Sequence, residues 1–353
     1  MSKRTRVFRV DPKAPQPEAI AVAGRTIRAG GLVAFPTETV YGLGANAFDD
    51  AAVAKIFAAK GRPANDPLIV HIARIDQLPQ VAKGIPAQAL ELSRRFWPGP
   101  LTLVLEKAER IPANLTAGLD TVALRMPNHA VALALLRSAN TPIAAPSANQ
   151  FSRPSPTSAR HVIDDLDGLV DVLLDGGLTP IGVESTILSL VDDPPRVLRP
   201  GGIPIEALRE ALPDLHYEPA YLADDVSPAP APGNMLRHYS PRARVILFAG
   251  ADDAEVYAAM RAEIAGHKRV GLLASDADAV EFADLEIPIE RLGADADAAA
   301  RRLFAALRSL DQQGMDCILA RAPAKTGLGL ALWDRLLRAA AGSLVEVPAG
   351  HTD

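Results

Sequence analysis

The sequence predicts an α/β protein with a mixed sheet and a second, smaller α/β domain. Short apolar runs alternate with helical windows through the first 212 residues, and the same alternation resumes after residue 243. Six prolines interrupt the stretch between them, so that stretch reads as an extended linker. At 353 residues the chain has the length of about two domains. We therefore predict a domain over 1–212, a linker over 213–243 and a domain over 244–353.

The predicted strands of the first domain are apolar runs enriched in leucine and β-branched residues. They are Leu32–Phe35, Leu68–Ile72, Leu101–Leu105, Val122–Leu124, Pro142–Ala145, Val170–Leu174, Ser185–Val191 and Arg196–Arg199. The predicted helices have apolar residues at helical spacing: Pro17–Ala29, Asp49–Ala59, Ala87–Phe96, Ala130–Ala139 and Thr157–Leu166. Asp49 can cap the second of these helices. The last two strands follow each other too closely for a helix, which favours a mixed sheet.

The second domain shows the pattern of a small parallel sheet. Its predicted strands are Arg244–Phe248, Val270–Leu273 and Cys317–Ala320, and its predicted helices are Ala254–Ile264, Asp295–Leu310 and Ala331–Ala340. The apolar setting of Cys317 predicts a buried structural thiol.

Composition excludes several classes of protein. Apolar residues make up 48% and charged residues 22%, which is typical of globular proteins. A single cysteine excludes an internal disulfide and a cysteine-built metal centre. No apolar stretch reaches membrane-spanning length, and the start, MSKRTRVFRV, lacks the apolar core of a secretory signal, so we expect a cytoplasmic protein without membrane contact. The net charge is −5, divided as +1 over residues 1–215 (23 basic, 22 acidic) and −6 beyond (14 basic, 20 acidic), which does not indicate general nucleic-acid binding.

Several familiar catalytic motifs are missing. The chain has no phosphate-binding P-loop sequence, no G-x-S-x-G and no H-E-x-x-H. The stretch Gly42-Leu43-Gly44 matches only the beginning of a dinucleotide fingerprint and follows a polar turn instead of a strand. We therefore reject a nicotinamide site.

Six loops that follow predicted strands or helices carry hydroxyl residues and cations. They are FPTETVYGLG at 35–44, KGRPANDP at 60–67, the strand end at 121–125, APSAN at 145–149 with the serines up to 158, GVEST at 182–186 and LRPGG at 198–202. Ligands of open α/β sheets bind at the carboxyl ends of strands, which favours a pocket at the first loop over a tight turn that needs positive φ at glycine. Each of the last four loops, taken singly, fits a structural turn equally well.

The residues of these loops favour chemistry by positioning and charge stabilisation. Lys60 and Arg62 suit a triphosphate, the one as a point charge and the other as a planar fork. Arg125, at a buried strand end, needs a partner, and a ligand carboxylate is one possibility. His71 on an apolar strand is, alone, more typical of a core histidine. Because no activated nucleophile is evident, phosphoryl or nucleotidyl transfer fits better than covalent hydrolysis.

The motifs resemble those of the threonylcarbamoyl-AMP synthase family, of YrdC type with an additional C-terminal domain. Lys60-x-Arg62 with Ser147-x-Asn149 is similar to the family signature K-x-R…S-x-N. FPTETVYGLG, NDPLIVH, FWPGPLT, RMP, APSAN, PSPT, GVESTI and LRPG occur in the family's order, over residues 30–205. The segment 232–241 resembles a linker element of the longer members, with Asn234 where methionine is usual. The resemblance implies a twisted, mixed YrdC-like sheet flanked by helices, and a Rossmann-like second domain.

The resemblance also implies a reaction and a set of site residues. L-threonine, bicarbonate and ATP with Mg²⁺ give threonylcarbamoyl-AMP and pyrophosphate, and other proteins then transfer the threonylcarbamoyl group to tRNA, so that tRNA is only an indirect partner. The implied threonine-binding residues are Thr39, His71, Arg125, Ala145 and Ser185. The implied ATP-binding residues are Arg62, Asn65, Thr121, Ser147, Asn149, Ser155, Arg199 and Tyr239, with Lys60 and Arg62 as catalytic cations and no protein ligand for the metal. The length and stiffness of the proline-rich segment and its polar cluster Arg237, His238 and Tyr239 further predict that Asn234–Tyr239 closes over the site as a lid. A simple spacer between the domains is the alternative.

Two other functions are compatible with parts of the sequence. A cationic sheet can bind RNA, but the near-neutral first half and only 5% aromatic residues weigh against an RNA-binding or ribosome-associated module. A carbamoyl-transfer domain like that of hydrogenase maturation uses a related pocket, but a single cysteine excludes the zinc-finger modules of that larger architecture.

Overall fold

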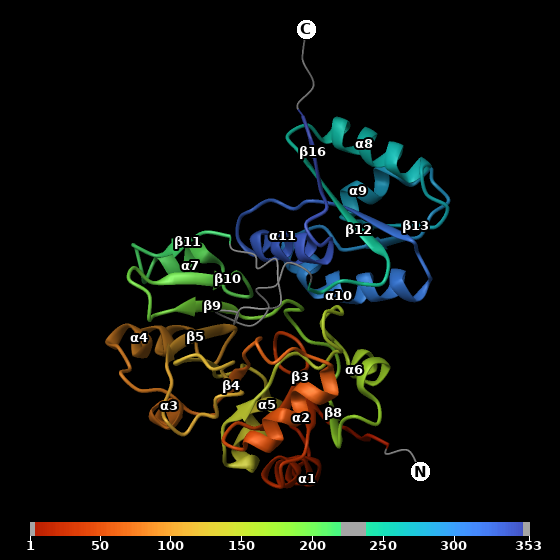
Figure 1. Cartoon of the computed structure of the whole chain (residues 1–353). Coiled ribbons are helices and arrows are strands. Elements are labelled where there is room, and N and C mark those ends of the chain that lie inside the picture. Colours follow the sequence, from red (N-terminus) through yellow and green to blue (C-terminus); the bar gives the residue numbers. More distant parts are fainter. Residues whose placement is uncertain (1–3, 220–237, 349–353) are drawn as a thin grey trace. The chain divides into compact units, whose positions relative to one another are not determined.

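The computed structural model describes residues 4–219 and 238–348 (Figure 1). The chain divides into two compact units. Unit 1 comprises residues 1–151 and 155–235, and unit 2 comprises residues 152–154 and 236–353. The predicted domain borders at 212/213 and 243/244 stay predictions, and most of the predicted lid, including Asn234, lies outside the described residues.

Unit 1 is built on an eleven-stranded mixed sheet, which confirms the predicted fold class. Its order is β1-β8-β2-β3-β7-β4-β6-β5-β9-β10-β11. The strands are β1 (Arg6–Arg9), β2 (Val33–Phe35), β3 (Gly42–Asn46), β4 (Ile69–His71), β5 (Leu101–Glu106), β6 (Thr121–Arg125), β7 (Ile143–Ala144), β8 (Val172–Asp175), β9 (Thr186–Ser189), β10 (Arg196–Arg199) and β11 (His216–Tyr217). Strands β4 and β6 run parallel, whereas β3 is antiparallel to both of its neighbours.

The helices of unit 1 cover this sheet with their apolar sides. They are α1 (Pro17–Arg28), α2 (Asp50–Lys60), α3 (Leu78–Val81), α4 (Ala87–Phe96), α5 (Ala130–Ala139), α6 (Ala159–Leu166) and α7 (Ile205–Arg209), with a 3₁₀ turn at Ile75–Gln77. Helices α1 and α5 pack together over one end of the sheet, in a core that includes Ile27, Leu135 and Phe35. The side chain of Asp49 accepts a hydrogen bond from the Ala52 amide, which confirms the predicted cap of α2.

Unit 2 is a five-stranded parallel sheet between two pairs of helices. Its strands, in the order β14-β13-β15-β12-β16, are β12 (Arg244–Gly250), β13 (Val270–Ala274), β14 (Ile289–Arg291), β15 (Cys317–Arg321) and β16 (Leu344–Val347). Its helices are α8 (Asp253–Ala265), α9 (Asp276–Glu281), α10 (Ala296–Gln312) and α11 (Leu328–Ala339). Figure 1 shows α8 and α9 on one face of the sheet and α10 and α11 on the other. This is the Rossmann-like layering that was predicted, and Cys317 is buried in it, which raises the pKa of its thiol to about 11.

The main local difference from the sequence prediction concerns residues 42–46. We expected a polar loop through Gly44, but Gly42–Asn46 forms β3, an interior strand of the sheet. Neither Gly42 nor Gly44 has positive φ. Position 44 has no room for a side chain, because a Cβ there would lie 2.8 Å from both Ile143 Cγ2 and Phe35 Cε1.

Candidate active site

The carboxyl ends of three strands of unit 1 bring together the residues predicted to bind threonine. Strands β4 and β6 are parallel, and their register pairs His71 with Arg125. The loop that follows β2 carries Glu38 and Thr39 to the same place, since Arg125 Nη1 donates to Thr39 Oγ1 at 3.1 Å. Thr39 in turn shares a 2.8 Å hydrogen bond with Thr37. The structure therefore places three of the five predicted threonine-binding residues in one buried cluster.

Arg125 has a protein partner within this cluster. Its Nη2 lies 2.6 Å from Glu38 Oε1, and both side chains are about 95% buried. Burial lowers the pKa of Arg125, while the Glu38 carboxylate opposes that shift. The expectation that a ligand carboxylate satisfies this arginine is therefore incomplete. Two buried atoms of the pair, Arg125 Nε and Glu38 Oε2, nevertheless have no hydrogen-bond partner within the described residues.

His71 lies beside this pair and is uncharged at neutral pH. Burial, together with the positive charge of Arg125, lowers the pKa of His71 to about 3. Its ring meets Phe35 edge to face with 6.3 Å between ring centres. Its Nδ1 has no hydrogen-bond partner within the described residues. A neutral imidazole in this place offers one hydrogen-bonding atom to a ligand without adding charge.

Acid is expected to destabilise unit 1 through His71. In the unfolded chain His71 has a pKa near 6.5, whereas in the folded protein its pKa is about 3. Between these two pH values the unfolded chain binds a proton that the folded protein does not, so the free energy of unfolding falls as the pH falls. At pH ~4.5 the loss from this one group is about 3 kcal/mol. His71→Gln should flatten the fall in unfolding free energy between pH 6.5 and 4.5, measured by urea denaturation. His216→Gln, at an exposed position, should keep the wild-type slope, and an unchanged slope in His71→Gln would refute the assignment.

Lys60 joins the two halves of the K-x-R…S-x-N signature. It is the last residue of α2, is 3% exposed, and its Nζ donates to the carbonyl oxygens of Ser147 and Asn149, both at 2.6 Å. The helix ends there because Gly61 takes the left-handed conformation, with φ 62°. A buried ammonium held by two carbonyls is a fixed positive charge, suited to an anionic ligand.

Arg62 and Asn65 lie in the loop between α2 and β4, and Thr121 begins β6. Arg62 forms an ion pair of 2.9 Å with Asp66, and its Nη2 also donates to the Pro67 carbonyl at 2.8 Å. The parallel register pairs Ile69 of β4 with Ala123 of β6, two residues after Thr121. Thr121 begins β6 and Arg125 ends it, so these two predicted residues lie at opposite ends of one strand.

Ser185 and Arg199 meet on neighbouring strands and loops. Arg199 Nη2 donates to the Ser185 carbonyl at 2.9 Å, and the Ser185 hydroxyl shares a 2.7 Å hydrogen bond with Thr102 of β5. In the preceding residue, the Glu184 carboxylate accepts a hydrogen bond from Ser155. These contacts fix three of the predicted residues within one hydrogen-bonded group.

Position 201 must be glycine because the loop of Ser185 lies too close for any side chain. A Cβ at this position would lie 2.4 Å from the Glu184 carbonyl oxygen and 2.5 Å from that of Ser185, which are backbone atoms that cannot rotate away. Gly201→Ala is expected to cost about 3 kcal/mol of unfolding free energy. Gly266→Ala, whose Cβ would meet one oxygen at 3.3 Å, is the control and should change little. Thermal denaturation of both variants measures the difference, and equal stability would contradict the steric argument.

Two further predicted residues, Ala145 and Tyr239, belong to different units. Ala145 is buried beside the cluster and contributes its backbone, since its amide donates to Ile69. Tyr239 belongs to unit 2, where its ring packs against Phe304 and beneath the guanidinium of Arg335. The predicted contact of Tyr239 with ATP stays a prediction.

No role is predicted from the sequence for the acidic and hydroxyl partners of the site. Glu38, Asp66, Glu184 and Thr102 each contact one of the predicted residues. A usable signal was present for Glu38, because a buried arginine requires a counter-charge and PTET supplies a carboxylate at a strand end. Thr102 carried no such signal, because its pairing with Ser185 depends on the parallel neighbours β5 and β9.

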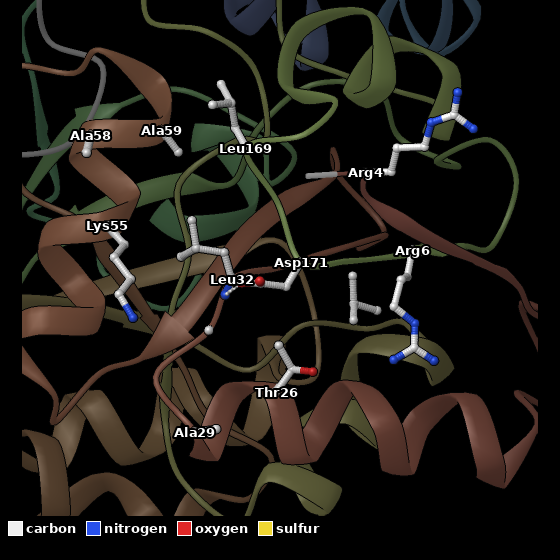
Figure 2. A pocket seen from close by; sticks show the side chains of 12 residues that line it. Arg4, Arg6, Thr26, Ala29, Leu32, Lys55, Ala58, Ala59, Leu169 and Asp171 are labelled. Carbon is white, nitrogen blue, oxygen red and sulfur yellow. Dashed lines mark hydrogen bonds between the residues drawn. The ribbon is translucent and has the colours of Figure 1, made fainter. Parts of the chain in front are cut away.

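A separate cavity of about 830 Å³ lies at the amino ends of β2 and β8 in unit 1 (Figure 2). It is lined by Arg6 of β1, Lys55 of α2 and Asp171, and by residues that precede β2. Among the described residues that line it, none belongs to the predicted site. The candidate site is therefore the set of groups around Lys60, Arg125 and Ser185.

Comparisons with known proteins cover both units. Residues 25–201 match the family described as "Telomere recombination", and residues 203–341 match "Threonylcarbamoyl-AMP synthase, C-terminal domain". Two curated relatives, each named threonylcarbamoyl-AMP synthase, come from Pyrococcus abyssi (48% identical, covering 93% of this chain and 96% of the relative) and Bacillus subtilis (43%, covering 98% and 99%).

A solved structure is similar over nearly the whole chain. The crystal structure of P. abyssi Sua5 complexed with L-threonine has a TM-score of 0.89 at 46% identity, and the match covers 97% of this chain and 100% of that one. No helix within the described residues is long and apolar enough to cross a membrane. The relatives favour an enzyme over the RNA-binding module considered from the sequence. The chain belongs to the threonylcarbamoyl-AMP synthase family of enzymes.

Proposed function

We propose that this protein makes threonylcarbamoyl-AMP and pyrophosphate from L-threonine, bicarbonate and ATP. The observation that carries the proposal is the buried cluster of Glu38, Thr39, His71 and Arg125, in which Arg125 Nε, Glu38 Oε2 and His71 Nδ1 lack a protein partner within the described residues. Buried polar atoms are normally satisfied, so such a cluster indicates a polar ligand. Donor and acceptor atoms side by side fit an amino acid, which carries both.

In this proposal threonine lies over the Arg125 end of the sheet. Arg125 donates to the amino-acid carboxylate through Nε, while Glu38 and Thr39 hold the two terminal nitrogens and so fix the plane of the guanidinium. Ala145 limits the space beside the ligand, and Ser185 contributes its hydroxyl. Uncharged His71 offers a hydrogen bond without repelling the ammonium of the substrate.

ATP binds to the remaining predicted residues, those around Arg62, Arg199 and Lys60. Arg62, Asn65 and Thr121 lie at the start of β4 and β6, whereas Ser155 and Arg199 come from the region of Glu184 and Ser185. Lys60, with Ser147 and Asn149, lies beside the phosphates. We propose that Mg²⁺ enters on the phosphate oxygens of ATP, since this ion usually binds through substrate phosphates and few protein ligands. Its charge, when bound, adds to the neutralisation of the leaving pyrophosphate.

The reaction needs no protein nucleophile. The threonine amine attacks CO₂, derived from bicarbonate, and loses a proton to give a carbamate. A carbamate oxygen then attacks the α-phosphorus of ATP, the bond to the bridging oxygen breaks, and pyrophosphate leaves. Lys60 and Arg62 stabilise the negative charge that builds on the leaving group, and the buried cluster holds the carbamate in line.

The product fits a role as an intermediate for RNA modification. A mixed anhydride of a carbamate and a phosphate is an activated acyl donor, and we propose that other proteins pass its threonylcarbamoyl group to an adenosine of tRNA. On this proposal residues 1–212 bind threonine and ATP, and 213–243 connect them to the domain over 244–353.

The direct test is pyrophosphate release from Mg–ATP by the full chain, with threonine and bicarbonate supplied together or singly. Release is expected only with both. Threonine replaced by L-valine, which has the same shape without the hydroxyl, should give slower release. Release from ATP alone at the full rate, or no release under any of these conditions from folded protein, would overturn the proposal.

A further inference from the structure

Unit 2 contains a cavity of its own at the carboxyl ends of its parallel strands. The cavity measures about 340 Å³ and is lined by residues of the loops that follow β13, β14 and β15, three adjacent strands. Leu273, Leu292 and Arg321 mark the ends of those strands. Ligands of open parallel sheets bind at this edge, and the volume lies within the range of small-molecule sites.

The polar side of the cavity is organised around a buried carboxylate. Asp278 is 7% exposed and accepts hydrogen bonds from Tyr257, Ser275 and Arg321, at 2.7, 2.8 and 3.1 Å. Burial alone would raise the pKa of Asp278, but these donors together lower it, so the carboxylate is charged at neutral pH. The network holds Ser275 and Arg321 in fixed positions at the cavity wall.

The remaining wall is mostly apolar, although Thr326 also lines it. Ala299 comes from α10, and Leu332 and Leu336 come from α11. Pro323, in the loop after β15, adds a further apolar side chain to the lining. A flat or apolar part of a ligand can therefore lie against these side chains while its polar groups meet Ser275 and the acidic side.

The charge of the lining disfavours anions. The lining carries two carboxylates, Asp278 and Asp295, but only one cation, Arg321, and this cation also pairs with Asp253. The amino end of α10 is capped by Asp295, whose Oδ1 accepts from the Ala298 amide at 2.7 Å. The positive helix end thus already has a carboxylate beside it, and a phosphate would meet repulsion. Hydroxyl and amino groups, which donate to carboxylates, are the matching ligand chemistry.

We propose that this cavity binds a neutral nucleoside, with its sugar hydroxyls toward Ser275 and the acidic side and its base against Ala299 and Leu332. The site lies entirely within unit 2 and does not depend on the proposed synthase reaction. It excludes nucleotides by charge, which distinguishes it from any ATP site.

Isothermal titration of adenosine into the full chain, in the presence of saturating Mg–ATP, tests this site. We expect one adenosine per chain with a Kd below about 1 mM. Ala299→Phe, which fills the cavity, should weaken binding at least about tenfold, and so should Ala324→Phe on the exposed loop. The second variant keeps the test valid if the first does not fold.

The control is Ala277→Phe, an exposed position of α9 that does not line the cavity, and it should bind adenosine as wild type does. AMP should bind this site at least about tenfold more weakly than adenosine, because of its phosphate. Absence of adenosine binding, or binding that both filling variants leave unchanged, would overturn the proposal. Equal affinity for AMP and adenosine would overturn the charge selection on which it rests.

Discussion

Replacing Lys60 by alanine is expected to lower the rate of threonylcarbamoyl-AMP synthesis at least about 1000-fold. The ammonium of Lys60 is buried and fixed by the carbonyl oxygens of Ser147 and Asn149, so its charge requires no reorganisation when a phosphate loses its bond. Water that enters the space left by the side chain cannot supply that charge. Single-turnover formation of pyrophosphate, at saturating substrates, measures the loss.

The matched control lies about one and a half turns away on the same helix. Lys55 of α2 donates to the Gly30 carbonyl at 2.6 Å, at the separate cavity of Figure 2 and outside the predicted site. Lys55→Ala should keep the rate within about threefold of wild type. A Lys60→Ala enzyme that is folded and as fast as Lys55→Ala would contradict the role of Lys60.

Replacing Arg125 by lysine is expected to raise the KM for threonine about 100-fold, because a single ammonium cannot bind Glu38, Thr39 and the substrate carboxylate in the directions that the planar guanidinium serves. The KM for ATP should change little, since Arg125 lies at the opposite end of β6 from Thr121. This separation of the two constants in steady-state kinetics distinguishes a threonine-binding role from general damage. Equal rises in both constants would contradict it.

Arg125→Met tests the structural side of the same residue. It leaves Glu38 buried without its cation, which typically costs about 3–5 kcal/mol. The double variant with Glu38→Gln removes the unpaired charge and should recover much of the stability while threonine binding stays lost. Denaturation and threonine titration of both variants separate the two roles of Arg125.

Strands and helices that are set by local patterns could be predicted from the sequence. Helices α4 and α5 and strand β10 have the predicted bounds, because an apolar face at a regular period and clear end signals determine such elements. Strand β3 was missed because its sequence, GLGAN, has low intrinsic strand propensity. It is extended because β2 and β7 pair with it on either side. Phe35 and Ile143 leave no room for a side chain at Gly44.

The cations of the candidate site were predicted from the sequence, but the carboxylates that pair with them were not. Loops at strand ends identified Lys60, Arg62 and Arg125, because cations there are chemically conspicuous. The pairing of Arg125 with Glu38 depends on how the loop after β2 crosses the end of β6, which no local pattern records. Likewise, the meeting of Lys60 with Asn149 joins residues 89 positions apart. Sequence alone connected them only through the resemblance to a family.

Mass detection of threonylcarbamoyl-AMP formed with ¹³C-bicarbonate tests the central claim most directly. The full chain, Mg–ATP and L-threonine should yield a product that carries the label, and omission of any one substrate should abolish it. Lys60→Ala should give none above background in the same time. Conversion of ATP to an unlabelled adenylate, or no adenylate from folded wild-type protein, would contradict the account.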